Sequence, residues 1–150
     1  MPSTFEKLNL KHHPTILVLN APASFEPELA ALHAVTILRT FDPLGTIDFS
    51  LAFVTTQQQV DTLAQAIASR AKGDAVVWFA YPKGTSKRYK SEINRDTGWQ
   101  VLGQAGFEPV RAVAIDEDWS AVRFRRVEFI KTMTRAKEHR MTAQGKARPK

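Results

Sequence analysis

The chain has 150 residues, which is enough for one domain with an ordinary hydrophobic core and leaves little room for a second. Hydrophobic residues make up 43% and charged residues 24%, as in globular proteins, and the lack of cysteine excludes disulfides, thiolate metal sites and a cysteine nucleophile. The first residues lack the apolar stretch of a secretory signal, and no apolar run has the length of a membrane span, so we expect a cytoplasmic protein with no membrane partner.

The net charge of +6 is unevenly distributed along the chain. Residues 1–126 hold 14 Lys and Arg against 13 Asp and Glu, whereas residues 127–150 hold 7 against 2. The long first part is therefore nearly neutral. We expect residues 136–150 to form a disordered basic tail, because they lack apolar residues in any regular pattern. A nucleic acid is a candidate partner for such a tail, through its phosphates.

Apolar runs and helix starts alternate in the first part of the chain. Residues 15–19 are continuously apolar, which predicts a strand buried on both faces. Glu26 followed by Pro27 is typical of the first turn of a helix. Two further strands are expected over residues 35–38 and 48–54. The order is that of strand–helix–strand units.

The middle of the chain holds the best-defined helix and the most apolar strand. Thr56 and Gln59 have the spacing of a capping box, and Gly73 is placed to end the helix that they begin. Residues 75–81 are apolar throughout and predict a buried strand. A further helix is expected to open at Asn94, with Gly106 at its end.

The last predicted strands form a hairpin. Residues 110–115 and 119–126 both favour strands, and only three acidic residues, 116–118, separate them. So short a connection permits only an antiparallel pair. The chain is then expected to continue as a helix from Val127.

Together these elements indicate a three-layer α/β fold. Its sheet is expected to be open and mixed, mostly parallel, and closed by the antiparallel hairpin. This is a Rossmann-like arrangement, and the hairpin resembles the end of the class I methyltransferase sheet. We assign residues 1–13 to an N-terminal extension, 14–135 to a single α/β domain and 136–150 to the tail.

In open α/β sheets, ligands bind outside the carboxyl ends of the parallel strands. Lys83 directly follows the most apolar strand and is placed to hold a phosphate or carboxylate there, in a stretch rich in polar and basic residues. A solvated basic loop is the alternative interpretation. The candidate ligand-binding residues along this edge are Asn20, Lys83, Ser86, Lys87, Asn94 and Arg95.

Two glycine-dependent phosphate motifs are missing. The segment around Lys83 does not have the Gly-x-x-x-x-Gly-Lys spacing of a P-loop. Residues 19–25, the first strand–helix turn, contain no glycine, although dinucleotide and S-adenosylmethionine sites of the usual kind need glycines there. The sequence therefore assigns no cofactor.

The final strand carries two more candidate binding residues. Its alternation places Arg123 and Arg125 on one face with Trp119, where they could bind a phosphate or carboxylate or could pair with acidic residues of the domain itself. The acidic residues 116–118 are interpreted as an ordinary turn, and the histidines lack ligand spacing, so no metal site is expected.

Several of these segments together resemble an uncharacterised bacterial domain-of-unknown-function family. The resemblance covers residues 14–126 and implies a compact Rossmann-like, methyltransferase-like fold, with no reaction that could be carried over. The residues that carry it are Tyr81-Pro82-Lys83, Asn94-Arg95-Asp96 and Trp119-Ser120-Ala121-Val122-Arg123-Phe124-Arg125.

The sequence supports one main hypothesis and three alternatives. The main one is a domain that binds an anionic or phosphate-bearing small molecule at the carboxyl edge of its sheet. The alternatives are a nucleic-acid-associated protein that acts through the tail, a partner-binding module whose hairpin forms a homodimer, and a degenerate methyltransferase-like enzyme.

Overall fold

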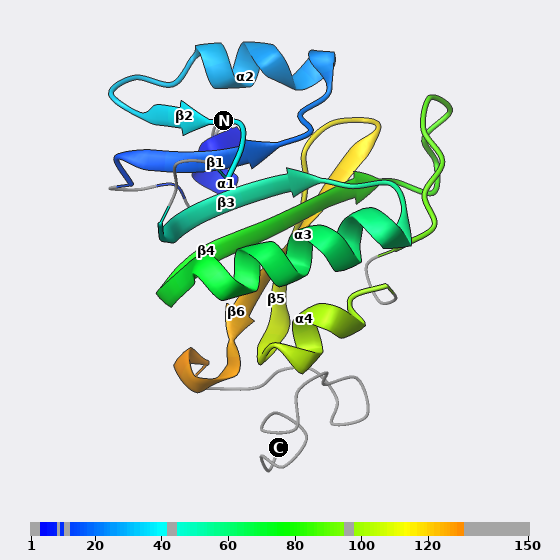
Figure 1. The fold of residues 1–150 in the computed structure, drawn as a ribbon. Helices are drawn as coiled ribbons and strands as arrows, with labels where there is room; N and C mark the ends of the chain where they lie inside the picture. Colours follow the sequence, from blue (N-terminus) through cyan, green and yellow to red (C-terminus); the bar gives the residue numbers. More distant parts are fainter. Residues whose placement is uncertain (1–3, 9, 11–12, 42–44, 95–97, 131–150) are drawn as a thin grey trace.

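A six-stranded mixed sheet forms the centre of the computed structural model, which describes residues 4–8, 10, 13–41, 45–94 and 98–130 (Figure 1). The strands run parallel from β2 to β4, and β6 is antiparallel to both of its neighbours, in the order β2-β1-β3-β4-β6-β5. This confirms the predicted open mixed sheet with its closing hairpin. The strands are β1 (Thr15–Leu19), β2 (Thr36–Leu38), β3 (Ile47–Phe53), β4 (Ala71–Pro82), β5 (Phe107–Ala114) and β6 (Trp119–Arg126).

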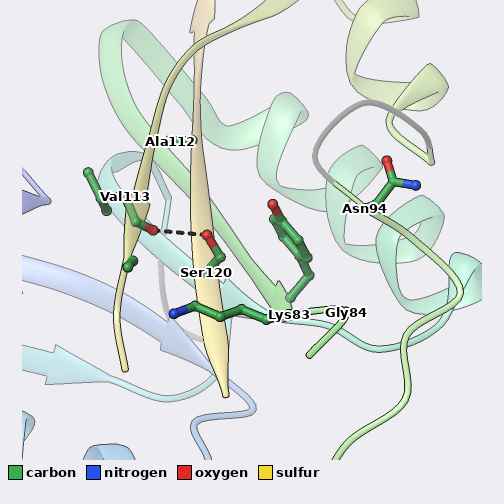
Figure 2. A pocket seen from close by; sticks show the side chains of 8 residues that line it. Lys83, Gly84, Asn94, Ala112, Val113 and Ser120 are labelled. Atoms are coloured by element: carbon green, nitrogen blue, oxygen red, sulfur yellow. Dashed lines mark hydrogen bonds between the residues drawn. The ribbon is translucent and has the colours of Figure 1, made fainter. Parts of the chain in front are cut away.

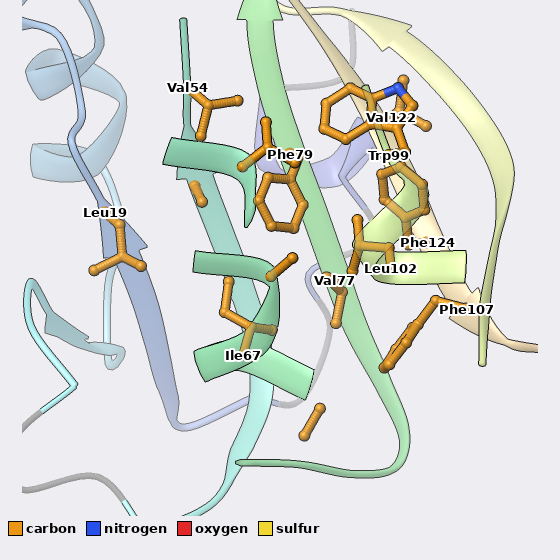
Figure 3. Close-up of a cluster of buried hydrophobic side chains, with 14 of the residues drawn as sticks. Leu19, Val54, Ile67, Val77, Phe79, Trp99, Leu102, Phe107, Val122 and Phe124 are labelled. Atoms are coloured by element: carbon orange, nitrogen blue, oxygen red, sulfur yellow. The ribbon is translucent and has the colours of Figure 1, made fainter. Parts of the chain in front are cut away.

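Helices cover both faces of the sheet and complete the three layers. One face packs against α3 (Gln57–Arg70) and α4 (Gln100–Gln104), and the other against α1 (Thr4–Lys7), η1 (Ala23–Phe25) and α2 (Glu26–Ala30). Figure 3 shows the first of these two cores, where side chains of β4 and β6 meet those of α3 and α4. Of the helices in the described residues, none is long and apolar enough to cross a membrane.

Strand β4 divides its side chains between the two cores. Val77 and Phe79 enter the core beneath α3 and α4, whereas Trp78 and Ala80 enter the opposite one. Successive side chains of a strand point to opposite faces, so a strand that is buried on both sides must be apolar throughout. This explains the continuous apolar run of the sequence.

The start of α3 agrees with the prediction, but its end does not. The Gln59 amide donates to the Thr56 hydroxyl at 3.2 Å, and the Gln59 side chain accepts from the Thr56 amide at 3.2 Å, which completes the capping box. The helix ends at Arg70, because Ala71 is already extended and begins β4. Gly73, with φ +58°, lies in the irregular first part of that strand instead of at the helix end.

The helix expected to open at Asn94 is shorter than predicted. It is α4, which begins at Gln100, so Asn94 lies before it in a non-helical segment. Of the helix expected after β6, the described residues contain a single 3₁₀ turn, η2 (Val127–Phe129), and the remainder lies outside them. The predicted tail, residues 136–150, lies outside the described residues, as do Arg95 and Asp96.

Residues from the predicted N-terminal extension contribute to the core. Phe5 and Leu8 are buried, and the Phe5 ring lies 5.7 Å from the Phe25 ring. The indole N–H of Trp78 donates to the carbonyl of Leu8 at 2.7 Å. The first described residues are thus fastened to the middle of β4, while the boundary predicted at residue 14 stays a prediction.

Candidate functional site

An open hollow of about 580 Å³ lies at the carboxyl end of β4 (Figure 2). Tyr81 and Lys83 contribute to it from the end of β4, Ser120 from the start of β6, and Asn94 from the segment that precedes α4. Residues 112–114 of β5 supply an apolar part of its wall. We call this hollow the carboxyl-edge pocket. It brings together Lys83 and Asn94, two of the residues predicted from the sequence.

The position of Lys83 follows from the pairing of β4 with β6. Pro82 is the partner of Trp119 in the register, and the Lys83 amide donates to the Asp118 carbonyl at 2.8 Å, directly beyond that pair. Figure 2 shows the Lys83 side chain directed toward the β5–β6 hairpin. Within the described part of the chain, no residue forms an ion pair or hydrogen bond with its ammonium group. The sheet therefore holds a half-exposed, uncompensated cation at the pocket.

Ser86 has a structural contact instead of a place in the pocket. Its hydroxyl donates to the Asp118 carboxylate at 2.9 Å and accepts from the backbone amide of Tyr89 at 3.2 Å. It thereby ties the segment after β4 to the hairpin turn. Lys87 is exposed on that segment and does not line the pocket. The sequence could not reveal the tie, because Asp118 lies 32 residues further on.

Asn94 reaches the pocket by a different route. The segment that carries it is held near the start of α3, where the Glu92 side chain accepts from the Gln57 amide at 2.9 Å. The indole N–H of Trp99 donates to the Asn94 carbonyl at 2.8 Å. These contacts place the exposed Asn94 side chain at the pocket even though it does not open α4.

Asn20 lies at a different place along the edge, between the ends of β1 and β3. Its side-chain amide faces the Phe53 carbonyl at 3.4 Å, and its φ is +60°. Asparagine is among the few residues other than glycine that adopt this left-handed conformation readily. The first strand–helix turn thus contains a left-handed residue although it has no glycine, but Asn20 keeps the Cβ atom that a glycine would lack. Because β1 has β2 on one side and β3 on the other, this is also the switch point of the sheet.

Arg123 and Arg125, the two candidate binding residues of β6, lie on the face of the sheet opposite the pocket. Arg125 donates two hydrogen bonds to the Asp74 carboxylate, at 2.7 and 2.6 Å. Of the two uses that the sequence allowed for Arg125, this is the pairing with an acidic residue of the domain itself. Arg123 is half-buried, and its pKa is lowered by burial and by the neighbouring Arg125 and Arg111. Trp119 packs between Phe53 and Tyr89, with ring centroids 5.1 and 4.9 Å away, in the core of this face.

The acidic residues of the hairpin form the predicted turn. One Asp116 carboxylate oxygen accepts from the backbone amides of Asp118 and Trp119, both at 2.8 Å. The Asp118 carboxylate in turn accepts a hydrogen bond from the Ser86 hydroxyl. These carboxylates thus fix the turn and the segment beside the pocket.

No protein-family model and no curated protein sequence matches the chain, but solved methyltransferase structures match its fold. A SAM-dependent methyltransferase from Aquifex aeolicus is 17% identical at a TM-score of 0.54, over 82% of this chain and 87% of its own. The fibrillarin pre-rRNA processing protein of Methanococcus jannaschii is 15% identical at 0.50, over 77% and 67%. The ribosomal protein L11 methylase of Lactobacillus delbrueckii subsp. bulgaricus is 12% identical at 0.50, over 82% and 74%. The chain has a methyltransferase-like Rossmann fold.

Within this methyltransferase-like fold, one feature of the switch point departs from nucleotide-binding Rossmann sites. Such sites usually place an acidic residue about 20 positions after the glycine turn, where it binds the ribose hydroxyls. Arg39 follows β2 in the corresponding region, and it forms a double hydrogen bond with Glu26, both distances being 2.9 Å. This contact lowers the pKa of Glu26, first through the hydrogen bond and also through the charge of Arg39. Glu26 is therefore ionised and already engaged.

Proposed function

We propose that this methyltransferase-like domain binds a small phosphate-bearing or otherwise anionic molecule in the carboxyl-edge pocket, with Lys83 as its main contact. The observation that carries the proposal is the ammonium group of Lys83, which has no partner among the described residues and lies at the end of the central strand. The pairing of β4 with β6 fixes the backbone of Lys83, whereas its flexible side chain becomes ordered only when an anion binds.

The other properties of the pocket support the same conclusion. Its volume of about 580 Å³ is within the usual range for small-molecule sites, roughly 300–1,000 Å³. Ser120 and Asn94 add polar groups, and residues 112–114 add an apolar surface for the uncharged part of a ligand. The exposed Lys87, Arg88 and Lys90 nearby increase the positive potential that attracts an anion.

Titration calorimetry with pyrophosphate and with nucleotides, in phosphate-free buffer, tests the proposal. We expect Lys83→Ala to weaken binding by about tenfold to a hundredfold, because a hydrogen bond to a charged group contributes roughly 1.5–3 kcal/mol. Lys87→Ala is the matched control, since it removes the same charge outside the pocket and should change the affinity less than Lys83→Ala does. Equal affinities of wild type and Lys83→Ala would contradict the proposal.

A degenerate methyltransferase-like enzyme is the second candidate. The left-handed Asn20 at the first strand–helix turn favours it, as do the methyltransferases with a similar fold. S-adenosylmethionine fits the switch point only in part, because Arg39, engaged by Glu26, stands where the ribose-binding carboxylate is usual. We therefore derive no transfer step. Saturable S-adenosylmethionine binding that persists in Lys83→Ala would favour this candidate over the first.

A further inference from the structure

Three arginines form a row across the hairpin face that is turned away from the carboxyl-edge pocket. Arg123 and Arg125 are two positions apart on β6, so their side chains leave the same face of the strand. Arg111 of β5 is the direct register partner of Arg123, and directly opposed residues of an antiparallel pair share a face. We call these residues the arginine row. Ser120 and Val122 point to the other face, toward the pocket and the core beneath α4.

The arginine row is only partly compensated by acidic residues. Asp74 pairs with Arg125 through both carboxylate oxygens, at 2.7 and 2.6 Å. Its charge also reaches Arg123 and raises the pKa of that side chain, but burial and the two neighbouring arginines lower it by more. Glu108 lies directly opposite Arg125 in the register and is buried.

Arg123 is the most informative member of the row. Its side chain is half-buried, and its buried Nε has no hydrogen-bond partner among the residues that the structure describes. Like charges directly opposite each other on paired strands destabilise a sheet, and a buried polar group without a partner does so too. An external anion at the guanidinium ends would relieve the repulsion between Arg111 and Arg123.

We propose that the arginine row binds the phosphate backbone of a nucleic acid. Guanidinium groups bind phosphate in a bidentate manner, and on paired strands they are spaced by about 5 Å across the ladder and about 7 Å along it. This spacing suits successive phosphates of a strand better than one small anion. The proposal concerns the opposite face of the sheet and is independent of the carboxyl-edge pocket.

The charge of the following residues favours a long polyanion as the partner. Residues 131–150 contain 7 Lys and Arg and one Glu, so their net charge is +6, the same as that of the whole chain. This stretch follows β6, the strand that carries Arg123 and Arg125, after only four residues.

Fluorescence anisotropy of the full chain with a short labelled poly-uridine strand, at several salt concentrations, tests the proposal. We expect the double variant Arg111→Gln/Arg123→Gln to bind about tenfold or more weakly. The slope of log affinity against log salt should fall in magnitude by about 1.4, which is roughly 0.7 for each lost phosphate contact with a single strand. The matched control is Arg70→Gln/Arg88→Gln, which removes two arginines from outside the row. Equal losses of affinity for poly-uridine in the two double variants would overturn the proposal.

Arg123→Leu separates binding from a purely structural role. Replacing a half-buried, incompletely paired charge by an apolar side chain should leave the melting temperature unchanged or raised, while the affinity for poly-uridine falls. A lower melting temperature with unchanged affinity would assign Arg123 to the fold alone and overturn the proposal. Tighter, row-dependent binding of poly-glutamate than of poly-uridine would overturn it in favour of an acidic protein partner.

Discussion

Lys83 and Ser86 are only three residues apart, yet their side chains have different roles. The Lys83 amide extends the pairing of β4 with the hairpin, and its ammonium group lies at the pocket with no partner among the described residues. The Ser86 hydroxyl instead donates a hydrogen bond to the Asp118 carboxylate. The sequence could predict a cation directly after a buried strand. It could not predict which neighbouring polar groups would be engaged, because their partner is more than thirty residues away and depends on the hairpin register.

The ion pair between Glu26 and Arg39 gives a prediction about pH. Arg39 lowers the pKa of Glu26 below its usual value of 4.5, so the pair favours the folded state above the unfolded pKa. That contribution is lost as the pH falls through the lower, folded pKa. We expect an NMR titration of the Glu26 carboxyl to show a midpoint below 4.5 in the wild type and one closer to 4.5 in Arg39→Gln. The same midpoint in both proteins would show that the pair does not persist in solution.

At the scale of elements, the described residues just before α4 depend on one glycine. Gly98 has φ +100°, and a Cβ atom there would overlap the Ile93 side chain. Its carbonyl also accepts from the Gln57 side chain at 2.8 Å, which joins the segment to α3. The glycine therefore helps to set where Asn94 meets the pocket.

We expect Gly98→Ala to lower the free energy of unfolding by about 2–4 kcal/mol, because backbone strain and overpacking add. Chemical denaturation measures this loss directly. Gly84→Ala is the matched control, since a Cβ atom at Gly84 would have no other atom within 4 Å and Gly84 does not have a positive φ. Similar losses in the two variants would contradict the explanation.

The predicted elements were most accurate where a strand is buried on both faces. The apolar runs that became β1 and β4 needed no knowledge of tertiary structure, and the capping box of α3 is a local signal. The predictions were wrong where tertiary contacts decide the boundary. Gly73 was predicted to end α3, but Ala71 already pairs with Ile47 of β3. Asn94 was predicted to open a helix, but α4 begins only at Gln100.

For the whole molecule, the fold class followed from the alternation of elements, but the packing of the N-terminal residues did not. Helix α1 has four residues, too few for a periodic pattern to identify it. Phe5 and Leu8 are nevertheless buried beside β3 and β4. Arg125 of β6 illustrates the same limit. The sequence could not decide whether Arg125 binds a ligand or pairs with an acidic residue of the domain, because only the fold brings Asp74 beside it.

The buried position of Phe5 leads to a prediction about global stability. Phe5→Ala should lower the free energy of unfolding by about 3–5 kcal/mol, as for other buried phenylalanines. Phe129→Ala is the control, because the Phe129 side chain is 36% exposed and should change stability less. Denaturant unfolding of both variants gives the comparison. No loss in Phe5→Ala would mean that the first residues are separable from the domain.

The central claim, that an anion binds in the carboxyl-edge pocket, is tested most directly by NMR. Amide chemical shifts of the full chain would be followed while pyrophosphate is added. We predict saturable changes at residues 81–84, 112–114 and 120, which lie in or beside the pocket, and their loss in Lys83→Ala. Saturable changes confined to Asn20 and the end of β3, with none around Lys83, would contradict the claim and place the ligand at the switch point of the sheet.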